Sequence, residues 1–230
     1  MSETTLSGFY GPRDNSLAVR YSLKIREQIF NRFQAEFGRH AKNILDVGAT
    51  NERISPDANF LEKLSPDSTK ITAVGIEDAG FLEAQFPGLK FLQIEAGKPL
   101  PFPDKSFDVV FSHAVIEHVT GDEARRFFVA EMARVGKVVF LTTPNRLFPI
   151  ETHTLVPLLH VIFPRLFYWL LNRKYFGDFY STDNLSLLTA GTLRKFLRSF
   201  TEYDVRIEKV RLFGLTSNLI AILKSRNTGV

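Results

Sequence analysis

The stretch ILDVGATNER, residues 44–53, decides the fold prediction because it places a buried strand directly before a turn. Two branched apolar residues lead into Asp46 and Gly48, a pattern typical of a strand that enters a phosphate- or nucleoside-binding turn. A glycine there lets the backbone turn tightly and approach a ligand closely. The later glycines of such a turn are absent, since alanine, threonine and asparagine follow. The stretch therefore predicts either a modified binding loop or a fold that only resembles one.

The composition is that of an ordinary globular protein with a high phenylalanine content. The 230 residues are 44% hydrophobic and 23% charged, enough to fill one α/β core. The 22 phenylalanines predict an aromatic core or an apolar pocket. Because the chain has no cysteine, disulfides, thiolate metal sites and thiol catalysis are excluded. The net charge of +4 is spread along the chain, so it permits nucleic-acid binding without indicating it.

The N-terminal residues 1–15 are acidic and polar where a signal peptide needs a basic start and an apolar run. The lack of cysteine is also compatible with the cytosol, where disulfides are rare. We therefore expect a cytoplasmic protein.

Strand and helix patterns alternate along the chain as far as residue 143. Apolar residues at every fourth position from Leu17 to Phe37 predict a helix that ends at Gly38. Buried strands are predicted at 43–47, 71–78, 89–95, 107–112 and 137–143. This alternation predicts a parallel sheet with helices on both faces. Two late strands, 203–214 and 217–225, predict an antiparallel finish at one edge, for a total of seven strands.

Two helix starts carry local capping signals. Ser55 and Pro56 resemble an N-cap followed by proline at the first helical position. Thr120 and Glu123 form a capping-box pattern before a helix that should end at Gly136. We therefore predict helices that begin at each of these signals.

Polar side chains follow four successive predicted strands, at the point where each strand ends. Ligands of an open parallel sheet bind outside these carboxyl ends. An acid after the second strand can accept hydrogen bonds from both hydroxyls of a ribose, and one after the third can accept from an exocyclic amine. Asp46 taken alone is equally consistent with a carboxylate that binds the amides of its own turn. The set together indicates a nucleoside site: Asp46, Glu77, Asp78, Glu95, Ser112 and His113.

These residues lie within motifs that resemble a known family. ILDVG at 44–48, VGIED at 74–78 and above all LPFPDKSFDVVFSHAVIEHV at 100–119 resemble class I S-adenosylmethionine-dependent methyltransferases of the type 11 branch. TPNRLFPIETHT at 143–154 also resembles a subset of that branch. The resemblance extends over residues 40–224. It implies a Rossmann-like three-layer sandwich, S-adenosylmethionine as cofactor and methyl transfer as the reaction.

The resemblance also implies roles for the residues of the first two strand ends. Asp46, Gly48 and Ala49 would border the methionine part of the cofactor. Glu77 would accept hydrogen bonds from the ribose hydroxyls, with Asp78 as a near alternative. The family usually has aspartate where this chain has Glu77, a change that keeps the charge and lengthens the side chain.

For the third and fourth strand ends, the resemblance implies contacts to the base and the sulfonium. Glu95, with the amide of Ala96, would hold the adenine; the family usually has aspartate at the Glu95 position too. Ser112 and His113 would lie beneath the cofactor near its sulfur.

The first turn departs from the family's D-x-G-x-G-x-G pattern, since only Asp46 and Gly48 match it. The spacing of 31 residues from Asp46 to Glu77 (77 − 46) exceeds the roughly 20 of a compact unit. We therefore expect a longer loop around residues 51–60. S-adenosylmethionine has no pyrophosphate, so a loop with fewer glycines can still bind it. The same loss argues against NAD, and hence against a dehydrogenase, because pyrophosphate depends most on those glycines.

A general base for methyl transfer would be a histidine, which can accept a proton at neutral pH. His153 follows the fifth strand, on the expected acceptor side, and is our candidate base; a structural histidine is the alternative. His118 is expected to pack at a helix start. No histidine pair shows metal-ligand spacing, so we expect no metal.

We expect a single domain over residues 1–230, with an N-terminal helical segment at 1–40 and a helical cap insertion at 144–190. Within the cap, residues 155–171 are apolar but contain two prolines, a histidine and an arginine, which disfavours a transmembrane helix. Three interpretations of this segment remain open: a cap over an apolar acceptor pocket, a membrane-surface helix, or additional core.

The sequence thus predicts a methyltransferase that acts on a small-molecule or lipid-linked acceptor by O-, N- or C-methylation. A non-catalytic scaffold or regulatory protein of the same fold is the first alternative, because of the altered turn. A nucleic-acid methyltransferase is the second; the chain lacks both the N/D-P-P-Y/F motif of base methylation and a separate RNA-binding domain. Peripheral membrane contact through 155–171 is possible, and nothing indicates the oligomeric state.

Overall fold

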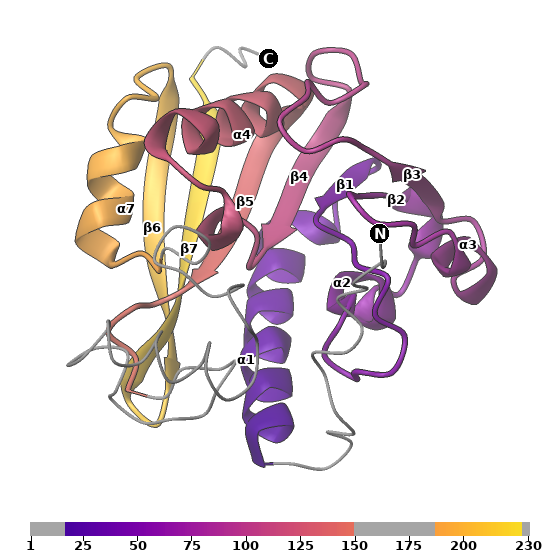
Figure 1. The fold of residues 1–230 in the computed structure, drawn as a ribbon, viewed down its shortest axis with the longest axis horizontal. Coiled ribbons are helices and arrows are strands. Elements are labelled where there is room, and N and C mark those ends of the chain that lie inside the picture. The colour runs from indigo at the N-terminus through magenta and orange to yellow at the C-terminus, as the bar shows by residue number, and fades with distance from the viewer. Residues whose placement is uncertain (1–16, 150–186, 227–230) are drawn as a thin grey trace, which may run out of the picture.

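A computed structural model describes residues 17–149 and 187–226, and Figure 1 shows a twisted sheet with helices packed on it. The seven strands lie in the order β3-β2-β1-β4-β5-β7-β6. Their bounds are β1 Ile44–Val47, β2 Ile71–Gly75, β3 Lys90–Gln93, β4 Phe107–His113, β5 Gly136–Pro144, β6 Tyr203–Leu212 and β7 Leu215–Ser225. β1 to β5 are parallel, and β7 runs antiparallel to both β5 and the edge strand β6. The predicted seven-stranded, mostly parallel α/β fold with an antiparallel finish is confirmed.

The helices cover both faces of this sheet. They are α1 Leu17–Phe33, α2 Phe60–Leu64, α3 Phe81–Gln85, α4 Asp122–Val135 and α7 Ala190–Leu197. α1 continues as the π-helical turn η2 Gln34–Gly38, and two short 3-10 turns are η3 Ser68–Lys70 and η4 Ile116–His118. Side chains of α1, α2 and α3 share one buried cluster with one face of the sheet. Side chains of α4 and α7 share a second cluster with the other face. These are the three layers that the sequence predicts. In the described part of the chain, no helix is both long and apolar enough to cross a bilayer.

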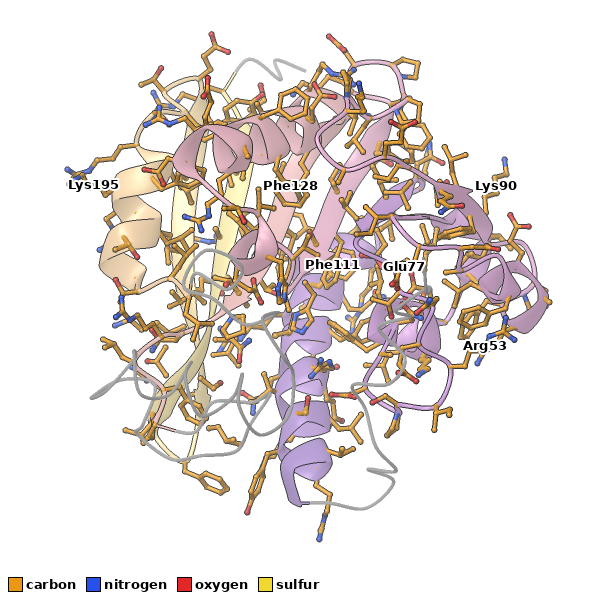
Figure 2. The ribbon with its side chains drawn as sticks, viewed as in Figure 1. Arg53, Glu77, Lys90, Phe111, Phe128 and Lys195 are labelled. Atoms are coloured by element: carbon orange, nitrogen blue, oxygen red, sulfur yellow. The ribbon has the colours of Figure 1, made fainter. Side chains whose placement is uncertain are left out.

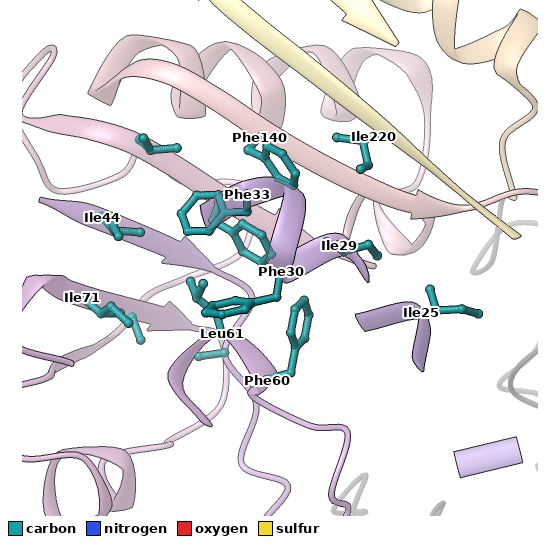
Figure 3. Close-up of a cluster of buried hydrophobic side chains, with 14 of the residues drawn as sticks. Ile25, Ile29, Phe30, Phe33, Ile44, Phe60, Leu61, Ile71, Phe140 and Ile220 are labelled. Carbon is teal, nitrogen blue, oxygen red and sulfur yellow. The ribbon is translucent and has the colours of Figure 1, made fainter. Parts of the chain in front are cut away.

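Part of the phenylalanine content lies in the first of these clusters, where α1 crosses the sheet (Figure 3). The Phe33 ring of α1 makes edge contacts with the rings of Phe111 on β4 and Phe140 on β5, with centroids 5.1 and 5.4 Å apart. Phe111 and Phe140 stack on each other at 5.6 Å. Such aromatic pairs add to the free energy gained from burial alone. The predicted aromatic core is therefore present beneath α1.

Two predicted helix starts are wrong. α2 begins at Phe60, because Ser55 instead begins a turn: its hydroxyl donates to the Asp57 carboxylate and its carbonyl accepts from the amide of Ala58. α4 begins at Asp122 with Gly121 as N-cap, whose φ of 87° is one that threonine rarely adopts. The predicted helix ends at Gly38 and Gly136 are confirmed within a residue.

The LPFPD motif is held by a single arginine of α4. The Arg134 guanidinium donates to the carbonyls of Leu100 and Phe102 at 2.8 and 2.9 Å. It also pairs with the carboxylates of Asp104 and Glu131, each at 2.8 Å. Arginine suits this task because its fixed fork of donors can satisfy several acceptors at once. Arg134 therefore fixes the LPFPD motif, and with it the chain between β3 and β4, against α4.

Candidate functional site

The carboxyl ends of β1 and β4 form the point at which strand order reverses. β1 pairs with β2 on one side and with β4 on the other, and Asp46 is in register with Ala73 and Phe111. Ligands of open α/β sheets bind outside the strand ends at this switch point. Seven of the nine residues predicted to bind the cofactor lie at or just after the ends of β1 to β4 (Figure 1). The other two, Asp46 and Ser112, occupy the next-to-last positions of β1 and β4.

The turn after β1 requires its glycine for two reasons. Gly48 has a φ of +117°, which favours glycine strongly. A Cβ added there would lie 2.3 Å from Cγ2 of Val115, in the loop after β4. The amides of Gly48 and Ala49 both donate to the carbonyl of Val74 on β2, at 2.9 and 3.0 Å. The turn is therefore fixed against β2 by its own backbone.

The loop that follows is longer than a compact turn, as predicted, and polar side chains order it. The Asn59 side chain accepts from the amide of Thr50 and donates to its carbonyl, both at 2.9 Å. Asn59 itself has a φ of 46°, a left-handed conformation that asparagine tolerates. Within the loop, Glu52 accepts from the amides of Ile54 and Ser55 at 2.8 and 3.1 Å. Side-chain hydrogen bonds thus define a loop that lacks the usual glycines.

Asp46 faces a second carboxyl group at the end of β1. Its side chain is 7% exposed, and Glu62 of α2, at 1% exposed, is its hydrogen-bond partner when one of the two carries a proton. Burial, followed by the charge of Glu62, raises the pKa of Asp46 well above its ordinary value. Burial likewise raises the pKa of Glu62. Since the amides of Gly48 and Ala49 donate to Val74, Asp46 does not serve to bind its own turn.

The two polar residues at the end of β4 point to opposite sides of the sheet. Ser112 is fully buried, and its hydroxyl donates to the carbonyl of Val47 at 2.8 Å, which ties β4 to β1. The Nδ1 atom of His113 lies 2.6 Å from Oγ1 of Thr142 on β5. Its ring packs edge-on against Phe60 of α2 at 4.8 Å. Burial, together with the charge of nearby Arg26, holds the pKa of His113 well below its ordinary value, so its imidazole is neutral.

The acids that follow β2 and β3 are more open to solvent. Glu77 is partly buried, and no described residue donates a hydrogen bond to its carboxylate; Figure 2 labels it at this end of the sheet. The Asp78 carboxylate, by contrast, accepts from the amide of Gly80 at 2.9 Å. Glu95 and Ala96 are exposed in the turn after β3. Glu77 is therefore the carboxylate after β2 that remains available to a ligand.

Sequence reasoning missed three residues of this region. Glu62 and Phe60 come from the short helix α2, where an acid beside a lysine is typical of a solvent-exposed face. Arg26 comes from α1; its guanidinium pairs with Asp57 at 3.2 Å and lies 5.8 Å from the Phe60 ring. The predicted base His153 and the segment 155–171 lie outside the described residues. No cluster of potential metal ligands is found in residues 17–149 and 187–226.

Comparison with protein families identifies the domain. A family described as a methyltransferase domain matches residues 45–138, the segment that spans β1 to the start of β5 and contains the candidate site. This segment is therefore similar to methyltransferase domains of the type 11 branch, the family that its sequence motifs resemble. The match supports methyltransferase as the enzyme class. No curated protein matches the chain.

Solved methyltransferase structures of low sequence identity share the fold of this chain. Magnesium protoporphyrin IX methyltransferase from Synechocystis, solved with bound S-adenosylhomocysteine, has 12% identity and a TM-score of 0.56. The 1,6-didemethyltoxoflavin-N1-methyltransferase of Burkholderia thailandensis has the same identity and TM-score, and for each the match covers 94% of this chain and 91% of the other. An S-adenosylmethionine-dependent methyltransferase from Aquifex aeolicus has 13% identity and a TM-score of 0.54, over 88% of this chain and 98% of its own. The overall fold of the chain is therefore shared with known methyltransferases.

Proposed function

We propose that this methyltransferase binds S-adenosylmethionine at the ends of β1 to β4 and transfers its methyl group to a small-molecule or lipid-linked acceptor. The observation that carries the proposal is the Glu77 carboxylate, partly buried at the end of β2 with no described donor, beside the buried carboxyls at the end of β1. A ribose diol supplies two hydroxyl donors to such a carboxylate. The α-ammonium group of S-adenosylmethionine supplies a positive charge that can pair with the buried carboxyls.

The remaining predicted residues complete this arrangement. Gly48 and Ala49 would border the methionine part, since their turn passes directly over β2. Glu95 and the amide of Ala96 are exposed beside the same edge, where the adenine would lie. Asp78 is the weaker candidate for the ribose because its carboxylate already accepts a hydrogen bond from Gly80.

The cofactor supplies an electrophilic methyl group on a positively charged sulfur, and the chain has to orient it and exclude water. His113 suits a position near that sulfur because its imidazole is neutral, so it does not repel the positive charge. The Ser112 hydroxyl, through its bond to Val47, fixes β4 beside β1 and so positions His113 relative to Asp46. His153 stays our candidate for the base that removes a proton from the acceptor.

The acceptor class is inferred from two kinds of support. The Synechocystis and Burkholderia enzymes are named for small-molecule substrates, a porphyrin and a toxoflavin precursor. The apolar segment 155–171 favours an apolar or lipid-linked acceptor, and with it a cap over the site. A cytoplasmic location remains part of the same proposal.

A methyl-transfer assay tests the proposal directly. The full chain would be incubated with methyl-labelled S-adenosylmethionine and a panel of phenols, amines, carboxylic acids and polyprenyl-linked hydroxyl compounds, with product detected by mass. Transfer to at least one acceptor, lost in His153→Ala but retained in Glu202→Gln, is expected; Glu202 is exposed before β6. Cofactor binding without transfer to any class of acceptor would instead support a non-catalytic scaffold.

A further inference from the structure

Two carboxyl groups share one buried space beside the cofactor site. Asp46, on β1, and Glu62, on α2, are 7% and 1% exposed, and each is within hydrogen-bonding reach of the other. α2 places its carboxyl there because Phe60 and Leu61, the residues before it, are buried in the cluster beneath α1. Burial of Glu62 is thus imposed by the packing of the whole short helix.

The carboxyl group of Glu62 has no hydrogen-bond donor among the described residues. Neither carboxyl oxygen of Glu62 accepts a hydrogen bond from an N–H or hydroxyl group in the described part of the chain. A buried acid without donors is costly, since transfer of a charge out of water is offset only by pairing or hydrogen bonding. The described part of the chain therefore holds a buried acidic group next to Asp46 that receives no hydrogen bond.

The charged groups around the pair are engaged elsewhere. Lys63, next to Glu62 on α2, donates its ammonium to the carbonyl of Ser55 at 2.9 Å. Arg26, on α1, pairs with Asp57 of the loop, and both act on the neutral His113 of β4. Among residues 17–149 and 187–226, Lys63 is the cation that acts on Glu62 electrostatically. A ligand can supply the directly bound positive charge that the described residues do not.

Two carboxylates in contact cannot both be ionised at low cost, so the pair retains a proton between them. A proton shared in this way fits the shift of both pKa values, which are raised chiefly by burial. The cofactor carries an α-ammonium group on its methionine part, next to which the proposed function places Asp46. An ammonium has three donors and can contact both carboxyls at once.

We infer that Glu62 is a second carboxylate for the α-ammonium of S-adenosylmethionine, and that cofactor binding displaces the proton that Glu62 and Asp46 share. The inference rests on the proposed function. The O–H bond of one carboxylic acid breaks, its proton passes to solvent, and both carboxylates then accept hydrogen bonds from the ammonium. No other reactant is needed.

Because binding releases a proton, the affinity for S-adenosylmethionine depends on pH. A proton that is bound in the free protein and released in the complex makes the affinity rise by about tenfold per pH unit while the pair is protonated. The rise ends once pH exceeds the pKa of the free pair. Glu62→Gln removes the shared proton, because its amide donates to an ionised Asp46, and should flatten this dependence.

Titration calorimetry in two buffers of different ionisation enthalpy measures the proton directly. The wild-type chain should release up to about one proton per S-adenosylmethionine bound. Glu62→Gln should release none and bind at least about tenfold more weakly at pH 8, where one charge-assisted contact is lost. Glu202→Gln, an exposed control, should match the wild type. Methylthioadenosine, which lacks the amino-acid part, should release no proton from either chain.

A second readout is independent of the cofactor. Ligand-free Glu62→Gln should unfold at a higher temperature than the wild type at pH 8, because the folded wild type must keep a proton on a buried acid that the unfolded chain loses at that pH. Wild-type binding without proton release, with equal affinity in Glu62→Gln, would overturn the inference and leave the proposed function intact. Absence of any S-adenosylmethionine binding by the wild type would overturn both.

Discussion

Gly48 is the residue on which the geometry of the turn after β1 depends most. Its positive φ and the 2.3 Å approach to Val115 are separate obstacles to any side chain. Gly48→Ala should therefore lower the free energy of unfolding by about 1–3 kcal/mol and weaken S-adenosylmethionine binding. Urea unfolding and calorimetry would measure the two effects.

The double variant Gly48→Ala/Val115→Ala separates these obstacles, because it removes the clashing methyl but leaves the backbone strain. It should recover part of the lost stability. Full recovery would show that φ contributes nothing, and no recovery would show that the contact with Val115 does not matter.

His113 gives the fold a pH dependence of predictable sign. Its pKa in the folded chain is lowered, chiefly by burial, while the unfolded value is about 6.5. Between these values the unfolded state binds more protons, so the contribution to stability is present above pH 6.5 and is lost as pH falls through the folded value. The free energy of unfolding of His113→Gln should accordingly depend less on pH below about 6.5 than that of the wild type.

His40→Gln is the matched control for that series, because His40 is exposed in the turn after η2. It should keep the wild-type slope. An unchanged slope in His113→Gln would mean that His113 titrates normally in the folded protein.

At the scale of elements, Asn59 joins the start of the β1 loop to the start of α2. Asn59 makes two reciprocal hydrogen bonds to Thr50 and has a left-handed backbone conformation. Asn59→Ala should lower the free energy of unfolding by about 1–3 kcal/mol, since it loses the bonds and strains the backbone. Denaturant titration would measure the loss.

Asn59→Gly distinguishes these causes, because it relieves the backbone while still losing both hydrogen bonds. It should be less destabilising than alanine, whereas Asn59→Asp should retain the bond from the Thr50 amide. An alanine variant as stable as the wild type would refute the role of Asn59 in closing the loop.

At the scale of the molecule, α1 is attached to the sheet by aromatic packing. Phe33 is fully buried against Phe111 and Phe140, whereas Phe127 of α4 is 38% exposed. Phe33→Ala should cost about 3–5 kcal/mol of unfolding free energy, and Phe127→Ala less than about 1 kcal/mol. Similar losses in the two variants, measured by urea unfolding, would contradict the described core.

The sequence predicted the sheet well because strand burial is encoded locally. Continuous apolar runs such as ILDV and FDVVF mark strands covered on both faces, and their alternation with helices implies parallel order. The helix starts at Ser55 and Thr120 were wrong, because a turn at Asp57 and the backbone of Gly121 override the local capping signals.

The candidate site was predictable only in part. Polar residues at strand ends follow from the sheet, so Asp46, Glu77 and His113 could be named. Glu62 could not, because its burial results from the packing of α2 under α1, between residues far apart in the chain. The pair Glu62–Lys63 reads as solvent-exposed in any local pattern.

Calorimetric titration of the wild-type chain and Glu77→Ala with S-adenosylmethionine, alongside NAD, tests the cofactor site most directly. The account predicts that S-adenosylmethionine binds the wild type, that NAD does not, and that Glu77→Ala binds at least about tenfold more weakly because the diol loses its acceptor. Unchanged affinity in a folded Glu77→Ala, or no binding of S-adenosylmethionine by the wild type, would contradict it.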